Sequence, residues 1–272
     1  KLAELPVALL GAAGLLLGAP WLVVAALVLL GARAALFGPA KYAILPEVLG
    51  SHELLGGNAL IATGTFLAIL VGSLLGGMSS AQDVAIIAVA LAVLGALASR
   101  WVPEQPGAAP TLALSRTPWG PTLEAWRATR EVRSVFLSVL ATSWLWALGV
   151  ALLALLPAYA RQALGSAAAV VALLLAVACV GMGLGALLAS RLGRQRIELG
   201  LVPLGALGTT VGLIGLWLLE VPAVEGAPRS VATLLAVPGA IGVLAAWALV
   251  ALSAGLYTVP LYAMIQDRSP PT

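Results

Sequence analysis

Long uninterrupted apolar runs make up most of the chain, and short polar segments separate them. An α-helix needs about 20 apolar residues to cross the hydrocarbon core of a bilayer. The runs here are continuous rather than alternating, which favours membrane-spanning helices over the strands of a barrel. We predict eight spans, at residues 3–18, 21–37, 54–77, 84–101, 134–160, 167–190, 199–219 and 231–262.

The composition agrees with a lipid environment. Of the 272 residues, 61% are hydrophobic and 9% are charged, whereas a soluble domain carries roughly 25% charged residues. We therefore predict an all-α membrane protein and exclude a water-soluble globule. With one cysteine, Cys179, and one histidine, His52, the chain has no internal disulfide framework and too few ligands for an ordinary metal cluster. We predict no catalytic residue, metal, cofactor or nucleic-acid partner, and no enzyme activity.

The basic residues predict how the spans are oriented, because cytoplasmic loops collect Lys and Arg. With Lys1 placed inside and the spans alternating, eleven basic residues fall in inner segments and two in outer segments. The inner ones are Lys1, Lys41, Arg100, Arg116, Arg127, Arg130, Arg133, Arg191, Arg194, Arg196 and Arg268; the outer ones are Arg161 and Arg229. Arg33 alone lies within a span. We predict a multi-pass membrane protein with both chain ends on the cytoplasmic side.

One connection is much longer than the others and divides four predicted spans from four. Residues 103–133 begin with a stretch rich in Pro and Gly, typical of a linker, and end in LEAWRATREVR. This second half predicts an amphipathic helix, either lying on the inner membrane surface or solvated. We predict three parts: part of an N-terminal bundle at 1–102, a cytoplasmic linker at 103–133, and part of a C-terminal bundle at 134–272. Small-residue spacings at 72–76, 181–185 and 208–212 predict close helix approach.

The sixth predicted span ends in GALLASRLGRQR, residues 185–196. This stretch resembles the loop signature of the major facilitator superfamily, roughly G-x-L-A-D-R-x-G-R-K-R. Arg191, Gly193, Arg194 and Arg196 match the signature, whereas Ser190 stands where the family has Asp. Glycine allows a tight turn, and the arginines suit helix ends at the inner surface. An ordinary basic cytoplasmic loop would look similar, so this motif alone leaves both interpretations open.

Longer motifs resemble the lysophospholipid transporter branch of that superfamily. They are ALFGPAKYAILPE at 35–47, ELLGGNALIATGTFLAILVGSLLGG at 53–77, RIELGLVPLGALG at 196–208 and VPLYAMIQDRSPP at 259–271. The resemblance implies a two-bundle fold of twelve spans, of which this chain would hold spans three to ten. In similar proteins the membrane domain is fused to an acyltransferase and an acyl-carrier-protein synthetase. The chain departs from the family at Ala62 and Leu153, where members often carry charged residues, so no charge-coupling scheme is inferred.

Two cations near the end of the second span are candidates for binding a phosphate. Lys41 follows the helix-breaking pair Gly38-Pro39, which we expect to end or bend the span, and Tyr42 adds an amphipathic ring at the interface. Arg33 lies two turns back within the span, where a cation needs a partner or a watery cavity. Lys41 is equally consistent with an anchor whose charged end reaches the interface, whereas Arg33 favours a binding role.

Asn58 and Thr65 are the polar candidates of the third span. They are seven residues apart, two turns along one helix face. Such a stripe lines a cavity or hydrogen-bonds a neighbouring helix; the second interpretation suits the threonine better. Asn58 is the only asparagine and follows Gly56-Gly57.

The resemblance implies uptake of a lysophospholipid across the bacterial inner membrane by alternating access. The lipid would be re-acylated inside the cell, with membrane lipid and an acyltransferase as partners. Two alternatives stay open: an exporter of drugs or small metabolites on the same scaffold, and a non-transporting membrane anchor for a fused acyltransferase. Glu4 and Glu220 lie near span ends, so we predict no proton relay in this part of the protein.

Overall fold

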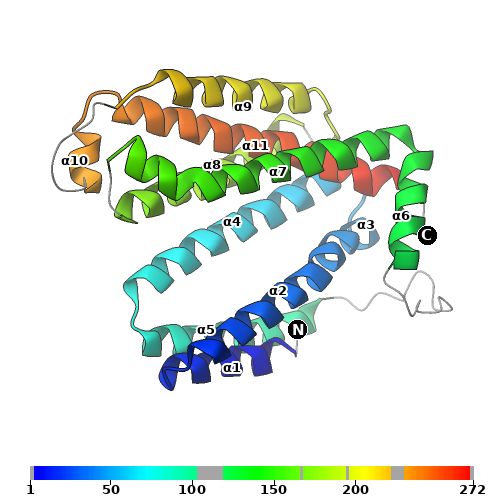
Figure 1. The fold of residues 1–272 in the computed structure, drawn as a ribbon. Coiled ribbons are helices and arrows are strands. Elements are labelled where there is room, and N and C mark those ends of the chain that lie inside the picture. Colours follow the sequence, from blue (N-terminus) through cyan, green and yellow to red (C-terminus); the bar gives the residue numbers. More distant parts are fainter. Residues whose placement is uncertain (1–2, 103–118, 166–167, 194–195, 222–229, 270–272) are drawn as a thin grey trace. The chain divides into compact units, whose positions relative to one another are not determined.

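The computed structural model describes residues 3–102, 119–165, 168–193, 196–221 and 230–269, and every regular element in these ranges is helical (Figure 1). The elements are α1 (Glu4–Leu16), α2 (Pro20–Ala43), α3 (Leu45–Val48), α4 (Leu54–Met78), α5 (Ala81–Ala98), the 3-10 helix η1 (Ser99–Trp101), α6 (Trp119–Glu131), α7 (Arg133–Gln162), α8 (Ala168–Leu192), α9 (Leu201–Leu218), α10 (Val231–Leu235) and α11 (Ala240–Arg268). The predicted all-α fold class is confirmed.

Six helices of the described chain are long and apolar enough to cross a membrane: α4, α5, α7, α8, α9 and α11. Two shorter apolar helical segments, Glu4–Leu16 and Pro20–Ala35, correspond to the first two predicted spans. Many large apolar side chains on these helices are exposed, including Trp217 at 79% and Trp144 at 71%. Exposure of this kind suits a lipid solvent, because soluble monomers rarely present large contiguous apolar surfaces.

The last predicted span, 231–262, is wrong in its bounds. The structure divides this stretch into the short helix α10 and the long helix α11. Ser230 caps α10, accepting a hydrogen bond from the Thr233 backbone N–H, and Gly239 breaks the helical path with φ +86° before α11 begins. A side chain at Gly239 would also meet the Glu220 carbonyl oxygen at 2.7 Å, so both conformation and space favour glycine there.

Of the two alternatives expected at Gly38-Pro39, an end of the second span is wrong, because α2 continues through both positions to Ala43; a bend there stays a prediction. A proline removes one backbone hydrogen bond from a helix. Membrane helices tolerate that loss where the neighbouring turns remain bonded. Lys41 therefore lies on the last turn of α2 rather than in a loop.

The chain divides into two compact units. The first comprises Lys1–Glu47 and Gly72–Leu112, and the second comprises Val48–Val71 and Ala113–Thr272. In the first unit α1 packs against α2 and α5, and a capping box between Ser80 and Asp83 starts α5. Residues 48–71 thus group with the second unit. The predicted end of the N-terminal bundle at residue 102 stays a prediction.

The predicted amphipathic helix in the long connection is present as α6, while residues 103–118 of the predicted linker lie outside the described ranges. Trp126 of α6 makes an edge-to-face contact with Phe136 of α7, with ring centroids 5.5 Å apart. The Arg130 guanidinium lies over both rings, at 5.9 and 5.8 Å. This aromatic and cation–π cluster attaches α6 to the start of α7.

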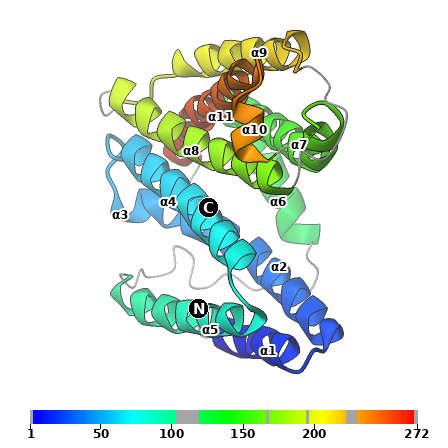
Figure 2. The same ribbon diagram turned by 90° about the vertical axis from the view of Figure 1, so that its left-hand side faces the viewer.

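Helix α11 is the centre of the second unit and packs against α8, α9 and α7 (Figure 2). Glycines of the flanking helices make this close approach feasible. A Cβ added at Gly181 would meet Ala251 Cβ at 2.7 Å, and one at Gly185 would overlap the Leu252 carbonyl. On α9, a Cβ at Gly212 would lie 2.8 Å from the Ala246 carbonyl oxygen.

The small-residue spacings at 181–185 and 208–212 are therefore confirmed as sites of close helix approach, since a Cβ at Gly208 would collide with Ser253 Oγ. The spacing at 72–76 shows no such contact within the described residues and stays a prediction. A Cβ added at Gly72 or Gly76 would meet no atom within 4 Å. The spacing of two glycines alone does not show whether the helix face that bears them packs against another helix.

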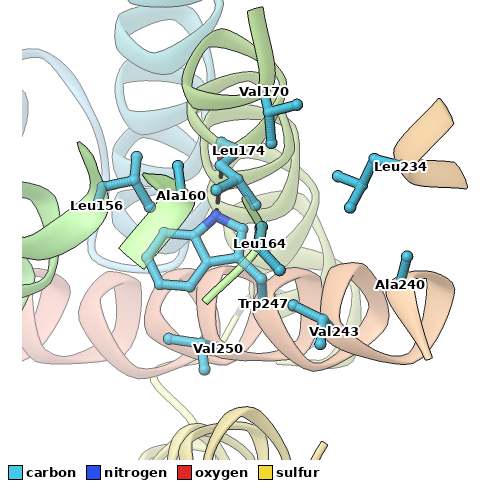
Figure 3. Packing of buried hydrophobic residues seen from close by; sticks show 10 residues of the cluster. All are labelled: Leu156, Ala160, Leu164, Val170, Leu174, Leu234, Ala240, Val243, Trp247 and Val250. Atoms are coloured by element: carbon cyan, nitrogen blue, oxygen red, sulfur yellow. Dashed lines mark hydrogen bonds between the residues drawn. The ribbon is translucent and has the colours of Figure 1, made fainter. Parts of the chain in front are cut away.

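A hydrophobic cluster surrounds Trp247 near the start of α11, where side chains of α7, α8, α10 and α11 meet (Figure 3). The indole Nε1 of Trp247 donates a hydrogen bond of 2.7 Å to the Leu174 carbonyl oxygen. Val243 and Leu164 are each 1% exposed. The indole N–H, the polar atom of a large apolar side chain, thus has a partner inside the cluster.

Gly185 and Gly72 make a matched pair for testing this packing. Gly185→Ala forces its Cβ into the α11 backbone, so we expect a loss of about 1–3 kcal/mol in the free energy of unfolding. Gly72→Ala meets open space and raises helix propensity by up to about 1 kcal/mol, so stability should be unchanged or slightly higher. Thermal unfolding of both variants in the same detergent measures the difference; equal stability of the two would contradict the packing described for α8 and α11.

Candidate functional site

Arg33 of α2 forms an ion pair with Glu4 at the start of α1. Its Nη2 donates to Glu4 Oε2 at 2.7 Å, and the two side chains are 22% and 23% exposed. A carboxylate in the first turn of α1 is also stabilised by the positive end of the helix dipole. The partner that an arginine within an apolar span requires is therefore a residue 29 positions earlier.

Aromatic rings accompany both cations of α2. The Arg33 guanidinium lies 5.5 Å from the centroid of the Phe37 ring, and Lys41 Nζ lies 5.0 Å from that of Tyr42. Arg33 and Lys41 are eight residues apart, which separates their Cα atoms by about 12 Å along the helix axis. Helix α2 thus presents two successive cationic positions rather than one cluster.

Asn58 and Gln266 form a reciprocal amide pair between α4 and α11. Asn58 Nδ2 donates to Gln266 Oε1 at 2.5 Å, and Gln266 Nε2 donates to Asn58 Oδ1 at 3.2 Å. Asn58 Nδ2 also donates to the Leu54 carbonyl oxygen at 2.8 Å. Asn58 is 1% exposed, so its polar atoms are satisfied within the protein, as a buried amide requires.

The two threonines of α4 differ in what they bind. Thr63 Oγ1 donates to the Gly183 carbonyl oxygen of α8 at 3.1 Å, an interhelical bond. Thr65 Oγ1 donates to the Ile61 carbonyl oxygen of its own helix at 2.7 Å. The hydroxyl of Thr65 is thus used locally in this conformation, and its predicted role in substrate binding stays a prediction.

The loop motif after α8 lies against the start of α4. Gly193 is buried, and a Cβ there would collide with Leu55 Cδ2 and lie 2.8 Å from the Arg196 carbonyl oxygen. Further along, the carbonyl of Gly183 meets Thr63, so α4 and α8 run antiparallel. Glycine is therefore needed at 193 because a side chain would collide with α4. This requirement adds to the tight turn that the sequence predicts there.

The basic residues of this motif are directed to the surface. Arg191 and Arg196 are exposed, and the Arg196 backbone N–H closes the turn on the Gly193 carbonyl oxygen at 2.8 Å. Arg194 lies outside the described residues. A cation at the end of α8 is favourable beside the negative end of the helix dipole. The start of α4, the end of α8 and the end of α11 share one end of the second unit.

Sequence reasoning missed Glu4 and Gln266 as partners. An acid at the start of one apolar helix and an arginine in the next are a usable signal, because each is costly in lipid without the other. Gln266 has a weaker signal, an amide near the end of an apolar span. Its pairing with Asn58 joins residues 208 positions apart, which single-sequence patterns do not specify.

The ion pair predicts a strong coupling between Arg33 and Glu4. Arg33→Gln or Glu4→Gln alone leaves one uncompensated charge, which we expect to lower the free energy of unfolding by about 1–3 kcal/mol, less than the 3–5 kcal/mol of a fully buried pair. The double variant carries no charge and should regain most of that loss. Unfolding of all four proteins in detergent gives the coupling energy; losses that simply add would contradict the pair.

Comparison with known proteins gives three findings. The model of the Major Facilitator Superfamily matches residues 5–272. A protein of Serratia proteamaculans (strain 568) named lysophospholipid transporter LplT is 32% identical over 249 residues, 88% of this chain and 57% of its own length. One of Salmonella heidelberg (strain SL476) with the same name is 33% identical over 270 residues, 96% of this chain and 61% of its own length. The chain thus spans about three-fifths of these relatives. No solved structure matches it significantly.

Proposed function

Because this chain belongs to the major facilitator superfamily, we propose that it is part of a transporter that carries a lysophospholipid across the membrane. The observation that carries the proposal is the similarity to proteins named lysophospholipid transporters along 88–96% of the chain. Alternating access of two helical bundles around one site is the general mechanism of transporters built from such repeats.

The headgroup phosphate would bind at Arg33. A guanidinium carries five N–H donors, of which a carboxylate takes at most two in the bidentate geometry. A phosphate can therefore bind beside Glu4 or replace it. The exposure of the pair, about a fifth for each side chain, gives a headgroup access. Glu4 then acts as the resting partner that lowers the cost of the cation in lipid while the site is empty.

Lys41 and Tyr42 supply a second position on the same helix, one that suits a headgroup arriving at the membrane surface. The ammonium and the phenol suit a phosphate and the interface respectively. Thr65 supplies a hydroxyl for the headgroup in the second unit. Asn58, buried and joined to Gln266, supports the site by holding α4 to α11.

We further propose a bacterial inner membrane location with both ends of this chain on the cytoplasmic side, as the distribution of basic residues indicates. Inward transport delivers a lysophospholipid to the leaflet where an acyltransferase, fused or separate, re-acylates it. The exposed Arg191 and Arg196 lie at the end of the second unit where α8 finishes, which suits a cytoplasmic loop.

Transport of a labelled lysophospholipid between the leaflets of vesicles containing the full-length protein tests the proposal. The uncharged double variant Arg33→Gln/Glu4→Gln removes the phosphate ligand without leaving a lone charge. We expect transport to fall about tenfold or more, the value of one hydrogen bond to a charged group. Arg100→Gln, which removes an exposed arginine at η1, is the matched control and should transport normally.

A neutral monoacylglycerol serves as a second substrate, because it has the chain without the phosphate. The double variant should leave movement of this compound unchanged. Failure of the unaltered protein to move lysophospholipid faster than empty vesicles would refute the proposal and favour an exporter or a non-transporting anchor. Equal transport by the double variant would refute the role of Arg33.

A further inference from the structure

The second unit contains an apolar cavity of about 160 Å³ between α4, α7, α8, α9 and α11. Its lining includes Phe66, Gly149, Cys179, Met182, Trp247 and Ala254. Every lining residue belongs to the second unit, and none carries a charge. The cavity is distinct from Arg33 and Glu4, which belong to the first unit.

The polar groups in the lining are already hydrogen-bonded to the protein. They are Thr209 Oγ1 to the Gly205 oxygen at 2.9 Å, Thr258 Oγ1 to the Ala254 oxygen at 2.7 Å, Trp247 Nε1 to the Leu174 oxygen at 2.7 Å, and Trp146 Nε1 to Tyr262 Oη at 3.0 Å. The donors of these groups are all in use, so a phosphate placed there would lose its water without gaining a hydrogen bond from them, at a cost of several kcal/mol for an ion. The lining therefore excludes a headgroup and accepts hydrocarbon.

We propose that this cavity binds the single acyl chain of the transported lipid. The inference rests on the proposed function for the identity of the lipid. The conclusion that the ligand is hydrocarbon rests on the apolar lining of the cavity. Apolar cavities of about 150 Å³ stay dry and take up small apolar ligands, so a cavity of this size holds a segment of one chain and has no room for the two chains of a bilayer phospholipid. Each methylene kept out of water while the headgroup crosses is worth about fourfold in an equilibrium.

Gly149 of α7 offers a way to fill the cavity. A Cβ added there meets no atom of another helix within 4 Å, so Gly149→Ala fits without displacing a neighbouring helix. The longer side chain of Gly149→Leu takes up space in the cavity that Gly149 lines. Gly64 of α4 is equally open, since a Cβ there also meets nothing within 4 Å, but it is not part of the lining. Gly64→Leu is therefore a matched control for the same substitution.

Cys179 makes the occupancy measurable. It is the only cysteine of this chain, it lines the cavity, and it is 4% exposed. A small apolar maleimide reaches its thiol through the cavity, and a bound chain blocks that route. The rate of labelling thus reports occupancy, and Cys179→Ala gives the background.

The experiment measures labelling of the full-length protein in vesicles of diacylphosphatidylcholine. Palmitoyl lysophosphatidylethanolamine is added at increasing mole fraction in the membrane, and glycerophosphoethanolamine, which has no chain, is the headgroup control. We expect the lysolipid to slow labelling and the headgroup alone to have no effect. Gly149→Leu should raise the half-protecting mole fraction about fivefold or more, the usual effect of overpacking. Gly149→Ala should raise it less, and Gly64→Leu should leave it unchanged.

Two outcomes would overturn the proposal: labelling that the lysolipid does not slow, and protection that Gly149→Leu leaves intact. A thiol blocked in diacyl lipid before any lysolipid is added would also overturn it, because ordinary lipid would then be the occupant. Transport measured on the same vesicles separates the two proposals. Transport without protection refutes only the cavity, whereas chain-dependent protection without transport refutes only the proposed function.

Discussion

The close approach of α11 to α8 and α9 is the contact on which the second unit depends. In lipid, apolar side chains gain little by leaving their solvent for one another, so helices associate through tight packing and interhelical hydrogen bonds. Gly181 and Gly185 on one side and Gly212 on the other bring the backbone of α11 to within contact distance. As a result α11 is the most buried of the membrane-spanning candidates.

The same solvent gives each polar side chain a specific reason to be present. Arg33 and Glu4 neutralise each other in the first unit, while Asn58 and Gln266 exchange amide hydrogen bonds in the second. A hydrogen-bonded polar pair in lipid can hold two helices together, and a polar substrate can also replace one partner of the pair. The ion pair, which is partly exposed, suits displacement by an anionic headgroup; the amide pair, where Asn58 is buried, suits fastening α4 to α11.

An amphiphile needs two environments, and the two proposals assign one to each unit. The cation of Arg33 suits a phosphate, and the cavity beside Cys179 and Gly149 suits hydrocarbon. The helices that line the cavity also make the contacts at one end of the unit. The turn at Gly193, after α8, packs against α4, and Asn58 of α4 pairs with Gln266 of α11. Movement of α4 relative to α8 and α11 would therefore change the cavity together with the end of the unit that holds the Gly193 turn.

Much of the fold follows from the sequence, because apolar runs of the right length specify helices and the motifs at 35–47 and 185–196 carry the family resemblance, which the comparisons confirm. The ends of helices were harder. Pro39 lies inside α2, and Gly239 divides a run that appears continuous. Of the candidate site, Arg33 and Asn58 were identified by their rarity, but their partners Glu4 and Gln266 depend on tertiary contacts. The cavity had no sequence signal, because its lining has the same composition as the lipid-facing surfaces.

The most direct test of the account is the side of the membrane on which the helix ends lie, since helices that cross lipid with their basic ends on the cytoplasmic side are the premise of the proposed transport. In a Cys179→Ala background, Arg130→Cys, Arg191→Cys, Arg268→Cys and Arg161→Cys each provide one exposed thiol for an impermeant maleimide. We predict that the first three react only in inverted vesicles and that the variant at 161 reacts only in right-side-out vesicles. Labelling of positions 130, 191 and 268 from different sides would contradict the account.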